Sequence, residues 1–417
     1  MIQADALLRH HSRLVLAVAL LAVALRGGVM VAGSDSFDDP DNYLPLARSI
    51  SEGKGLVWNG RPTAYRPPLY PSLLAPLVQW SGPRPLFAIA VFHLALAAGT
   101  VWMTASAARK WGLSDWRILI AAAIVACDPV LLWQSRFVMT ETLGAFLTAL
   151  ALAELADPRW RGAVAGGASL GLASLCRPSL LPGAGLVVLG CLPVGSGTRR
   201  QRLLRGLALA LSMIAVLTPW AIRNALVLGE PIITTTHGGY TLALANNEPY
   251  YRDVLAGSSG RVWTGKDQFL WWDSVTQATA GMSEPEADRF LRQTVIRLAV
   301  KQPATFLRAC VDRLNRFWSV APAVAVYSPV IRLATAIWTI PLWMALAIGL
   351  LRREQWSWPR IAAPLAIVGL SLVHTLYWTD IRMRAPIVPA IALVAASAVL
   401  PIWSGRTRTA YETTAGS

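Results

Sequence analysis

The sequence has few charged residues and even fewer acidic ones. Charged residues make up 15% of its 417 positions, against about 25% in a typical soluble chain, and the mean hydropathy is +0.46. These values exclude an ordinary soluble enzyme and predict an integral membrane protein. Lysine is also scarce, so arginine carries most of the net charge of +15. The only lysines are Lys54, Lys110, Lys266 and Lys301.

Cysteine is too sparse to define a framework. Cys127, Cys176 and Cys191 lie in apolar stretches and Cys310 stands alone, so the sequence predicts neither disulfides nor a zinc site. Nucleic acid is not expected as a partner, because the basic residues are spread between apolar segments and form no stripe on a polar domain. Arginine suits phosphate binding, so the charge points to membrane phospholipid or a phosphorylated lipid. A biased codon usage would give the same arginine excess.

The long apolar stretches predict about ten transmembrane helices, because a helix needs about 20 mainly apolar residues to cross the hydrocarbon. The predicted spans are 14–32, 84–108, 116–134, 138–156, 161–176, 179–195, 204–226, 328–351, 359–378 and 385–403. Arginines cluster in alternate gaps, which places those gaps and both termini in the cytoplasm. The predicted fold class is therefore an all-α polytopic membrane protein. We expect the first span to be retained, with a cleaved signal peptide ending near Gly33 as the alternative.

Two long polar segments, 33–83 and 227–327, then lie outside the membrane. They divide the chain into a membrane module (1–226), an external loop (227–327) and C-terminal membrane helices with a short cytoplasmic tail (328–417). In the first segment, 44–52 and 69–80 predict short helices on the membrane surface.

The second external segment predicts a short extended piece over 231–240 that ends in a turn at the glycine pair Gly238-Gly239. Residues 284–318 predict two basic amphipathic helices, separated at Pro303, of the kind that lies on a membrane surface.

Four aspartates precede Tyr43 in the first external segment. Clustered carboxylates beside a membrane can bind a cation, or one of them can act as a general base. A solvated acidic loop is the alternative, since loops commonly collect aspartate and proline. The four residues are Asp35, Asp38, Asp39 and Asp41.

The stretch from Asp39 through Tyr43 to Ala47, followed by Gly53-Lys-Gly55 and Tyr65-Arg66-Pro-Pro, resembles the first external loop of the GT-C glycosyltransferases. These membrane enzymes include protein O-mannosyltransferases, aminoarabinose lipid A transferases and bacterial transferases that use polyprenyl-phosphate sugars. The resemblance implies a GT-C-like fold with Asp39 as the catalytic aspartate. Asp38 or Asp41 takes that role if the register is shifted.

The resemblance continues along most of the chain. Glu141 matches the family's second acidic position, and Arg177-Pro178 resembles the basic residue outside the fifth span. The stretch Thr236-His-Gly-Gly-Tyr240 and the pair Asn246-Asn247 look like the loop after the seventh span. Arg382-Met-Arg384-Ala-Pro386 is similar to the pattern that opens the last span.

Each matched position carries an expected role. The resemblance implies that the donor phosphate is bound by Arg66, Arg177, Arg382 and Arg384, and that sugar or acceptor is contacted by Tyr43, His237, Asn246 and Asn247. Interface anchoring would explain the arginines as well, helix capping would explain Glu141 and turn formation would explain the asparagines. No cofactor is certain. A divalent cation held by Asp39 and Glu141 stays open.

The sequence therefore predicts an inverting transferase of the bacterial inner membrane with its active site on the external side. It would move a hexose or pentose from a polyprenyl-phosphate donor to a lipid, polysaccharide or protein acceptor, with Asp39 as general base and Glu141 beside it. A glycolipid transporter or flippase is the main alternative, and a non-catalytic scaffold is the third. A transporter favours ionisable residues near the midplane of its spans and internal repeats, whereas most charges here lie at span ends.

Overall fold

The computed structural model describes residues 2–33, 37–82, 84–195, 197–252, 263, 266–323 and 326–399. Within these ranges it is helical except for turns, connecting loops and one two-stranded antiparallel ribbon, β1 (Val57–Trp58) with β2 (Arg61–Pro62). The predicted all-α class is confirmed. Of the four clustered aspartates, Asp35 lies outside the described residues.

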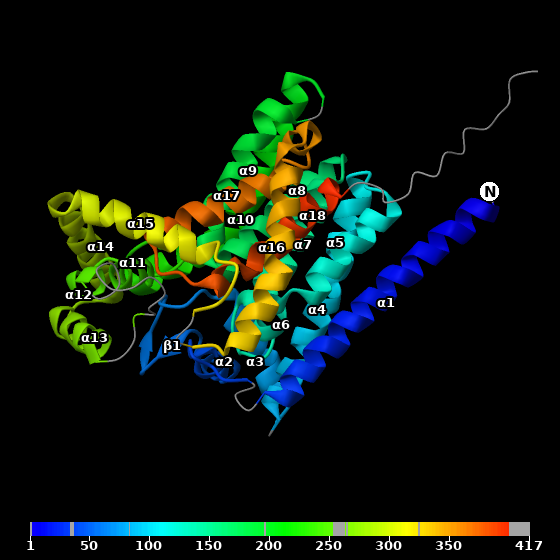
Figure 1. Cartoon of the computed structure of the whole chain (residues 1–417). Coiled ribbons are helices and arrows are strands. Elements are labelled where there is room, and N and C mark those ends of the chain that lie inside the picture. The colour runs from blue at the N-terminus through cyan, green and yellow to red at the C-terminus, as the bar shows by residue number, and fades with distance from the viewer. Residues whose placement is uncertain are drawn as a thin grey trace, which may run out of the picture.

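A bundle of apolar helices forms the body of the molecule (Figure 1). Its members are α1 (Ile2–Ala32), α4 (Pro85–Lys110), α5 (Asp115–Cys127), α6 (Pro129–Gln134), α7 (Glu141–Leu155), α8 (Trp160–Cys176), η1 (Pro178–Leu180), α9 (Leu181–Val194), α10 (Arg199–Leu228), α16 (Pro329–Leu351), η3 (Arg353–Trp356), α17 (Ala362–Leu376), η4 (Ile381–Ile387) and α18 (Val388–Ala398). Each predicted span falls on a member of this bundle or on two consecutive ones. Among the described residues, five segments are long and apolar enough to cross a membrane alone. The chain is thus a multi-pass membrane protein.

The third predicted span, 116–134, is not one helix. It breaks at Asp128, whose carboxylate accepts the backbone N–H groups of Val130 and Leu131 at 3.0 Å each and so starts α6. Pro129 has no N–H to continue the helical ladder of α5. The last carbonyls of α5 are satisfied by Arg26 of α1, which donates to the oxygens of residues 125 and 126 at 3.0 Å each. The break is therefore stabilised from both sides.

Small residues allow the bundle helices to approach closely, as is usual between helices in membranes. A Cβ on Gly167 of α8 would lie 2.2 Å from the carbonyl oxygen of Leu209 in α10. A Cβ on Gly369 of α17 would lie 2.2 Å from the Cα of Gly183 in α9. Any side chain at either glycine would push the two helices apart.

The predicted surface helices of the first external loop are α2 (Tyr43–Ser51) and α3 (Leu69–Trp80). The second long polar segment, 227–327, contains α11 (Gly238–Leu244), α12 (Glu248–Tyr250), α13 (Lys266–Ala278), α14 (Glu284–Lys301) and α15 (Pro303–Phe317). The two predicted basic helices are α14 and α15, separated at Pro303. The predicted turn at Gly238-Gly239 is wrong, because the pair begins α11. A Cβ on Gly239 would lie 2.2 Å from the carbonyl oxygen of Asp288, so this glycine serves close packing of α11 on α14.

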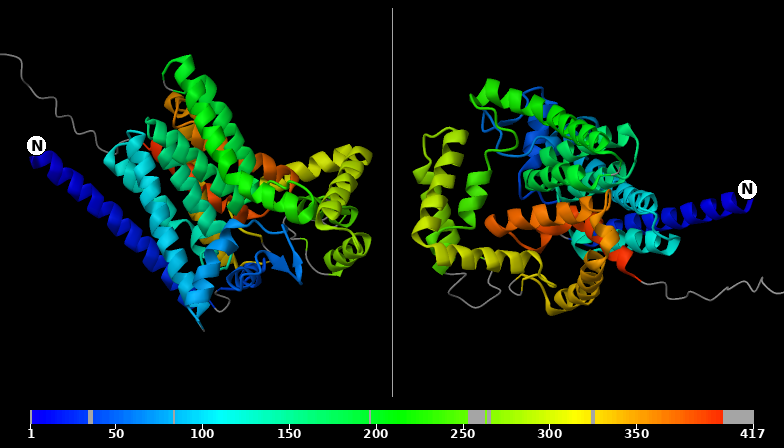
Figure 2. Two further views of the ribbon diagram at one scale, coloured as in Figure 1. Left: turned by 180° about the vertical axis from the view of Figure 1, so that it is seen from behind. Right: turned by 90° about the horizontal axis from the view of Figure 1, so that it is seen from above.

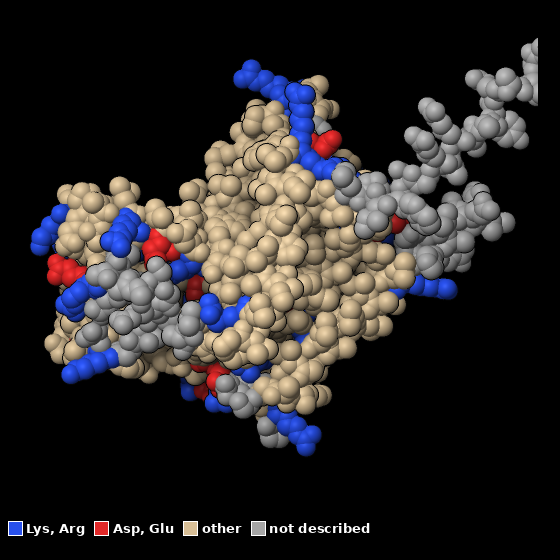
Figure 3. All heavy atoms as spheres, in the orientation of Figure 1, with Lys and Arg blue, Asp and Glu red and all other residues tan. Residues whose placement is uncertain are grey.

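Helices α13 to α15 stand beside the bundle in all the ribbon views (Figures 1 and 2). On the face drawn in Figure 3, charged side chains gather at the upper end of the bundle, over α13 to α15 and at the lower end. A wide uncharged belt separates the upper group from the lower one. Such a belt is what a chain embedded in hydrocarbon requires, since charges are costly at that depth.

Candidate active site

A cavity of about 930 Å³ lies where segments from most of the chain meet. Its walls come from the segment between α1 and α3, the start of α7, the junction of α8 with η1, residues 234–244, the helices α13 and α14, and the turn between α17 and η4. A drug-sized ligand site is typically 300–1,000 Å³, so this cavity has room for a sugar phosphate.

The charged side chains that line the cavity are mainly basic. Two carboxylates, Asp41 and Glu284, face four arginines. The arginines are Arg66, Arg177, Arg292 and Arg382. The cavity therefore favours an anion. Three of the four predicted phosphate-binding arginines meet here, although they are separated by more than 300 residues of sequence.

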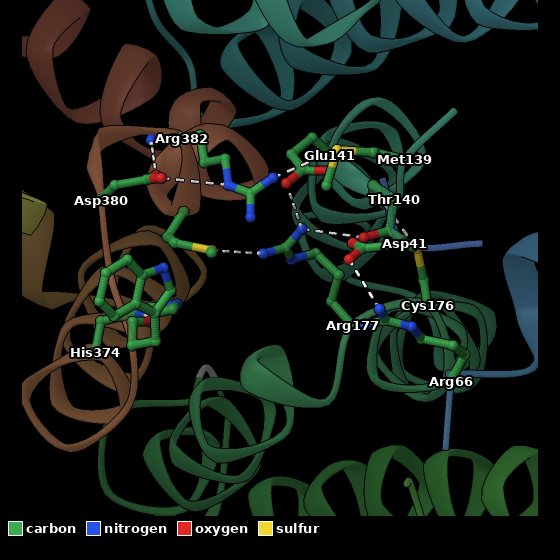
Figure 4. A network of polar contacts seen from close by, with 12 residues as sticks. Asp41, Arg66, Met139, Thr140, Glu141, Cys176, Arg177, His374, Asp380 and Arg382 are labelled. Atoms are coloured by element: carbon green, nitrogen blue, oxygen red, sulfur yellow. Dashed lines mark hydrogen bonds and ion pairs between the residues drawn. The ribbon is translucent and has the colours of Figure 1, made fainter. Parts of the chain in front are cut away.

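Asp41 is the aspartate of the cluster that lines the cavity. Its Oδ1 lies 3.0 Å from Nη2 of Arg66, and Figure 4 shows the two side chains pointing toward each other. The Arg66 guanidinium also lies 5.5 Å from the ring centre of Tyr65 and 5.9 Å from that of Tyr43, which is cation–π distance. Tyr43 lines the cavity as well, and its ring is almost fully buried.

Asp39 and Asp38 are placed differently. Asp39 does not line the cavity, and its two carboxylate oxygens accept the backbone N–H groups of Tyr43 at 2.8 Å and Leu44 at 2.7 Å. The side chain thus caps the start of α2. Burial raises the pKa of Asp39 above its ordinary value, and the two backbone hydrogen bonds oppose that rise. Asp38 is exposed and contributes a backbone carbonyl to the N–H of Val138.

Glu141, the first residue of α7, is fully buried behind the cavity wall. Its carboxylate forms an ion pair at 3.0 Å with Nη1 of Arg177, which also donates to the hydroxyl of Thr140 at 3.0 Å. Glu141 therefore fixes the arginine that reaches the cavity, while Thr140 and Arg177 line the wall itself.

Arg177 and Arg382 both point N–H groups at sulfur. Nη2 of Arg177 contacts Sδ of Met383 at 3.2 Å, and Nη1 of Arg382 contacts Sδ of Met139 at 3.4 Å (Figure 4). A thioether is a weak acceptor. The Nε of Arg177 is buried without a hydrogen-bond partner among the described residues. These donors are thus poorly satisfied, which is the condition in which guanidinium groups bind phosphate well.

Arg384 does not line the cavity, so the geometry gives no support to its expected role in donor binding, which stays a prediction. Its side chain is buried, and Nη1 donates to the carbonyl oxygens of Ser319 at 2.6 Å and Phe317 at 3.2 Å. The guanidinium also lies 4.9 Å from the ring centre of Trp343. In the 3₁₀ helix η4, residues two positions apart point in different directions. Arg382 therefore faces the cavity and Arg384 ties η4 to the end of α15.

Asn246 and Asn247 also lie outside the cavity wall, in contrast to the expected sugar contacts. The amide of Asn246 donates to the carbonyl oxygens of Leu242 and Leu376 at 2.8 Å each, and its oxygen accepts from the hydroxyl of Tyr251 at 3.1 Å. The oxygen of Asn247 accepts the N–H of Tyr250 at 2.8 Å. Both side chains hold the backbone, as the alternative interpretation predicted.

His237 lines the cavity within a group of aromatic rings. It stacks on Tyr240 at 5.2 Å between ring centres and meets the edge of Tyr65 at 4.3 Å. Its Nε2 lies 3.4 Å from Nη1 of Arg66. Burial, and secondarily the charge of Arg66, lower the pKa of His237 well below its ordinary value, so the ring is neutral and its Nε2 accepts from Arg66.

Sequence reasoning missed the contribution of α14. Glu284 accepts the backbone N–H of Ala64 at 3.0 Å and the hydroxyl of Thr236 at 2.9 Å, so it joins the first external loop to the second. Arg292 adds the fourth arginine. No local pattern marks these residues, because the contact between residues 64 and 284 spans 220 positions.

The described residues contain no group of three or more His, Cys, Asp or Glu side chains that could hold a metal ion. Asp39 and Glu141 are each occupied, one by the start of α2 and the other by Arg177. A divalent cation between them stays a prediction.

The fold has relatives among solved structures. An archaeal oligosaccharyltransferase from Archaeoglobus fulgidus, tethered with an acceptor peptide, matches with a TM-score of 0.55 at 15% identity over 93% of this chain and 49% of that chain. The oligosaccharyltransferase AglB from the same organism, in complex with an inhibitory peptide and a dolichol-phosphate, matches with a TM-score of 0.52 at 16% identity over 93% of this chain and 50% of that chain. The fold of this chain is thus similar to that of these archaeal oligosaccharyltransferases.

The GT-C resemblance stated from the sequence is thus confirmed for the fold. This chain covers about half the length of the archaeal oligosaccharyltransferases that it matches. ArnT from Cupriavidus metallidurans gives a TM-score of 0.42 at 14% identity over 95% of this chain and 78% of that chain. A family model described as dolichyl-phosphate-mannose-protein mannosyltransferase matches residues 72–225. That range contains Glu141 and Arg177 and excludes the aspartate cluster and Arg382. No curated protein matches the sequence.

Proposed function

We propose that this chain is a GT-C glycosyltransferase that moves a monosaccharide from a polyprenyl-phosphate donor to a lipid, polysaccharide or protein acceptor. The observation that carries the proposal is the pair Arg177 and Arg382. Both reach one large cavity, and both direct N–H groups at thioethers, which are weak acceptors. The phosphate of a lipid-linked sugar would replace those contacts with charge-assisted hydrogen bonds.

The location of the cavity fits a lipid donor. It opens among α2, the end of α17 and η4, at one end of the apolar helices. A polyprenyl tail stays in the bilayer while its phosphate stays at headgroup depth, so a transferase must offer cations at this level. The charge pattern of the short loops, in which the other end is rich in arginine, favours the external side for this cavity and the bacterial inner membrane as the site of action.

The general base belongs to the aspartate cluster, and the geometry favours Asp41 over the expected Asp39. A base must reach the proton that it removes, and Asp41 lines the cavity whereas Asp39 does not. Asp39 holds the start of α2, and so positions Asp41, through its two backbone hydrogen bonds. One observation favours Asp39 as the alternative base: burial raises its pKa, whereas Asp41 is paired with a guanidinium.

The reaction that this arrangement supports is a direct displacement. The acceptor oxygen or nitrogen forms a bond to the anomeric carbon while the bond from that carbon to the phosphate oxygen breaks, which inverts the anomeric centre. The acceptor proton passes to the aspartate. The polyprenyl phosphate leaves as an anion that Arg177 and Arg382 stabilise, so it needs no proton. The ring group of Tyr65, His237 and Tyr240 provides an aromatic surface for the sugar.

The test uses the full chain in detergent, a polyprenyl-phosphate sugar labelled in the sugar, and a membrane extract as the source of acceptor. We expect release of polyprenyl phosphate together with transfer of label. Asp41→Asn should abolish both and leave donor binding in place, whereas the exposed Asp38→Asn should retain them. Full activity in Asp41→Asn with loss in Asp39→Asn would move the base to Asp39. Movement of donor across vesicle membranes without any transfer would replace the transferase with a flippase.

A further inference from the structure

A second, smaller cavity of about 210 Å³ lies at the other end of the bundle. It is lined by residues just after α4, at the start of α5, around η3 and at the end of α18. The segment Ile381–Ala398 begins at the first cavity, through Arg382, and ends at the second, through Ser397. At 1.5 Å per helical residue, about 25 Å separate the two. The second cavity has no part in the proposed transfer.

Three arginines line this second cavity, namely Arg117, Arg352 and Arg360, against one carboxylate, Glu354. None of the three guanidinium groups has a carboxylate within 4.0 Å among the residues that the structure describes, where every recorded ion pair involves other arginines or lysines. Three positive charges are thus gathered around one carboxylate that forms no close ion pair with them, and such an excess of like charge is costly unless an anion is bound.

Backbone carbonyls hold the three arginines in place. Nε of Arg117 donates to the oxygen of Val399 at 3.1 Å, Nη2 of Arg352 donates to the oxygen of Ala398 at 2.9 Å, and Nη2 of Arg360 donates to the oxygen of Trp111. These carbonyls lie at the ends of α4 and α18, where helices leave acceptors unsatisfied. Each guanidinium carries five N–H donors, so each keeps donors for a ligand. The arginines are positioned before any anion arrives.

A second observation identifies more of the ligand. Gln355 lines the same cavity and is 1% exposed, and its Oε1 is buried without a hydrogen-bond partner among the described residues. The amide orientation is fixed because Nε2 donates to the carbonyl oxygen of Arg360 at 2.9 Å. A buried acceptor without a donor loses its hydration and gains nothing. The ligand that suits this cavity therefore combines phosphate with a hydroxyl group.

The surroundings place this cavity at headgroup depth. Leu351, the last residue of α16, is 86% exposed, and Trp356 of η3 is 47% exposed beside the arginines. Exposed tryptophan next to an apolar helix end is typical of the membrane interface. At about 30 Å³ for each water molecule, the cavity has room for about seven, which is enough for a phosphate and a small polyol group.

We propose that the cavity at the end of α4, α16 and α18 binds the headgroup of an anionic phospholipid whose phosphodiester carries a neighbouring hydroxyl, as a glycerol-type headgroup does. Arg117, Arg352 and Arg360 bind the phosphate, and Gln355 accepts from the hydroxyl. Basic pockets between transmembrane helices are suited to such headgroups. The bound lipid would fasten α4, α16 and α18 to one another at the end opposite the active site.

The test measures binding of phosphatidylglycerol to the full chain in detergent by native mass spectrometry and by thermal shift. Phosphatidylcholine and phosphatidylmethanol with the same acyl chains serve as the zwitterionic probe and the hydroxyl-free anionic probe. We expect phosphatidylglycerol to bind about tenfold more tightly than phosphatidylcholine and measurably more tightly than phosphatidylmethanol. Equal affinity for all three lipids would overturn the proposal. Equal affinity for the two anionic lipids would overturn the role of Gln355.

Because the first cavity also attracts phosphate, substitutions are needed to distinguish which of the two cavities binds phosphatidylglycerol. Arg352→Gln with Arg360→Gln should lose the preference for phosphatidylglycerol, whereas Arg353→Gln should keep it, because Arg353 is exposed in the same 3₁₀ helix and does not line the cavity. Retention of the preference in the double variant would overturn the assignment. If the double variant does not fold, Glu354→Gln decides the matter: removing the lone carboxylate should tighten binding, and unchanged affinity would contradict the site.

Inorganic phosphate distinguishes the source of the ligand. If millimolar phosphate raises the melting temperature of the wild type but not of the double variant, and displaces phosphatidylglycerol, the arginines bind phosphate from solution as well. If phosphate has no effect while phosphatidylglycerol binds, the lipid is the ligand. A rise of equal size in both proteins would assign phosphate to another part of the chain and count against the site.

Discussion

The two cavities of this protein both gather arginines, yet they satisfy them in different ways. In the larger cavity, Arg66 pairs with Asp41 and Arg177 pairs with Glu141, while N–H groups of Arg177 and Arg382 contact thioethers. In the smaller cavity, backbone carbonyls at helix ends hold each arginine, and no carboxylate among the described residues forms an ion pair with any of them. Carboxylates beside cations supply proton acceptors for chemistry. Carbonyls supply only position, which suits binding without reaction.

The largest expected effect tests whether the acids of the first cavity perform chemistry. Asp41→Asn keeps the shape of the side chain but removes the proton acceptor, so transfer should fall by about 10²–10⁴-fold. The measurement is the rate of label transfer from a polyprenyl-phosphate sugar at saturating donor. Asp38→Asn is the matched control. A loss of less than about threefold in Asp41→Asn would remove the distinction between a catalytic and a binding cavity.

The second prediction compares two arginines of η4: Arg382 lines the larger cavity, whereas Arg384 donates to backbone carbonyls at the end of α15. Arg382→Ala should weaken donor binding by about tenfold or more, because a charge-assisted contact to phosphate is lost, with little change in melting temperature. Arg384→Ala should lower the free energy of unfolding by about 2–4 kcal/mol, because the carbonyls of Phe317 and Ser319 lose their donor. Titration with polyprenyl phosphate and thermal unfolding measure the two effects. If Arg382→Ala lowered stability and Arg384→Ala weakened donor binding instead, the roles given to the two arginines would be wrong.

The first cavity depends on the packing of α11 against α14, whereas the second lies at the other end of the bundle, at the ends of α4, α16 and α18. Gly239→Ala places a Cβ against the backbone of Asp288, so α11 must move away from α14 at a cost of about 1–3 kcal/mol. Donor binding should weaken while phosphatidylglycerol binding at the second cavity stays. Gly281→Ala is a poor control because its φ is positive. Gly185→Ala, which has open space around it, should leave both unchanged.

The smallest expected effect is on the pH dependence of stability. Histidine side chains line the larger cavity but not the smaller one, so this effect tests the larger cavity alone. The pKa of His237 is lowered in the folded chain, so the folded state binds fewer protons than the unfolded state below pH 6.5. The stability is therefore complete above pH 6.5 and falls as the pH drops below it, by up to about 1.4 kcal/mol per pH unit.

His237→Gln, which keeps an acceptor for Arg66, should lose this component of the pH dependence. Melting temperatures of the two proteins between pH 7.5 and 5.5 measure it. Parallel curves would show that His237 does not carry the proton linkage. Binding of phosphatidylglycerol at the second cavity should vary equally with pH in both proteins.

The sequence predicted the parts of the fold that depend on local pattern. Apolar runs located the bundle helices other than η3, and the capping residues and prolines located α2, α3, α14 and α15. The sequence pattern does not predict the helix break at Asp128, because the apolar run continues through it. The arginine that stabilises the break, Arg26, comes from α1, about 100 positions away. The start of α11 differs from the predicted turn because the glycine pair begins a helix, where Gly239 allows close contact with α14.

For the site, local sequence pattern is enough to predict which residue types lie near the membrane surface and in which loops they lie. A hydrophobic chain with few acids can keep its charges only at helix ends and in loops, so Arg66, Arg177 and Arg382 were predictable candidates. The sequence does not predict which of these side chains point into the cavity. Whether Arg382 or Arg384 faces the cavity, and whether Asp39 or Asp41 does, depends on how η4 and α2 are rotated against their neighbours. That rotation is set by packing against other elements, since α2 packs on α3 and η4 packs on α7 and α15, and a local sequence pattern does not encode such contacts.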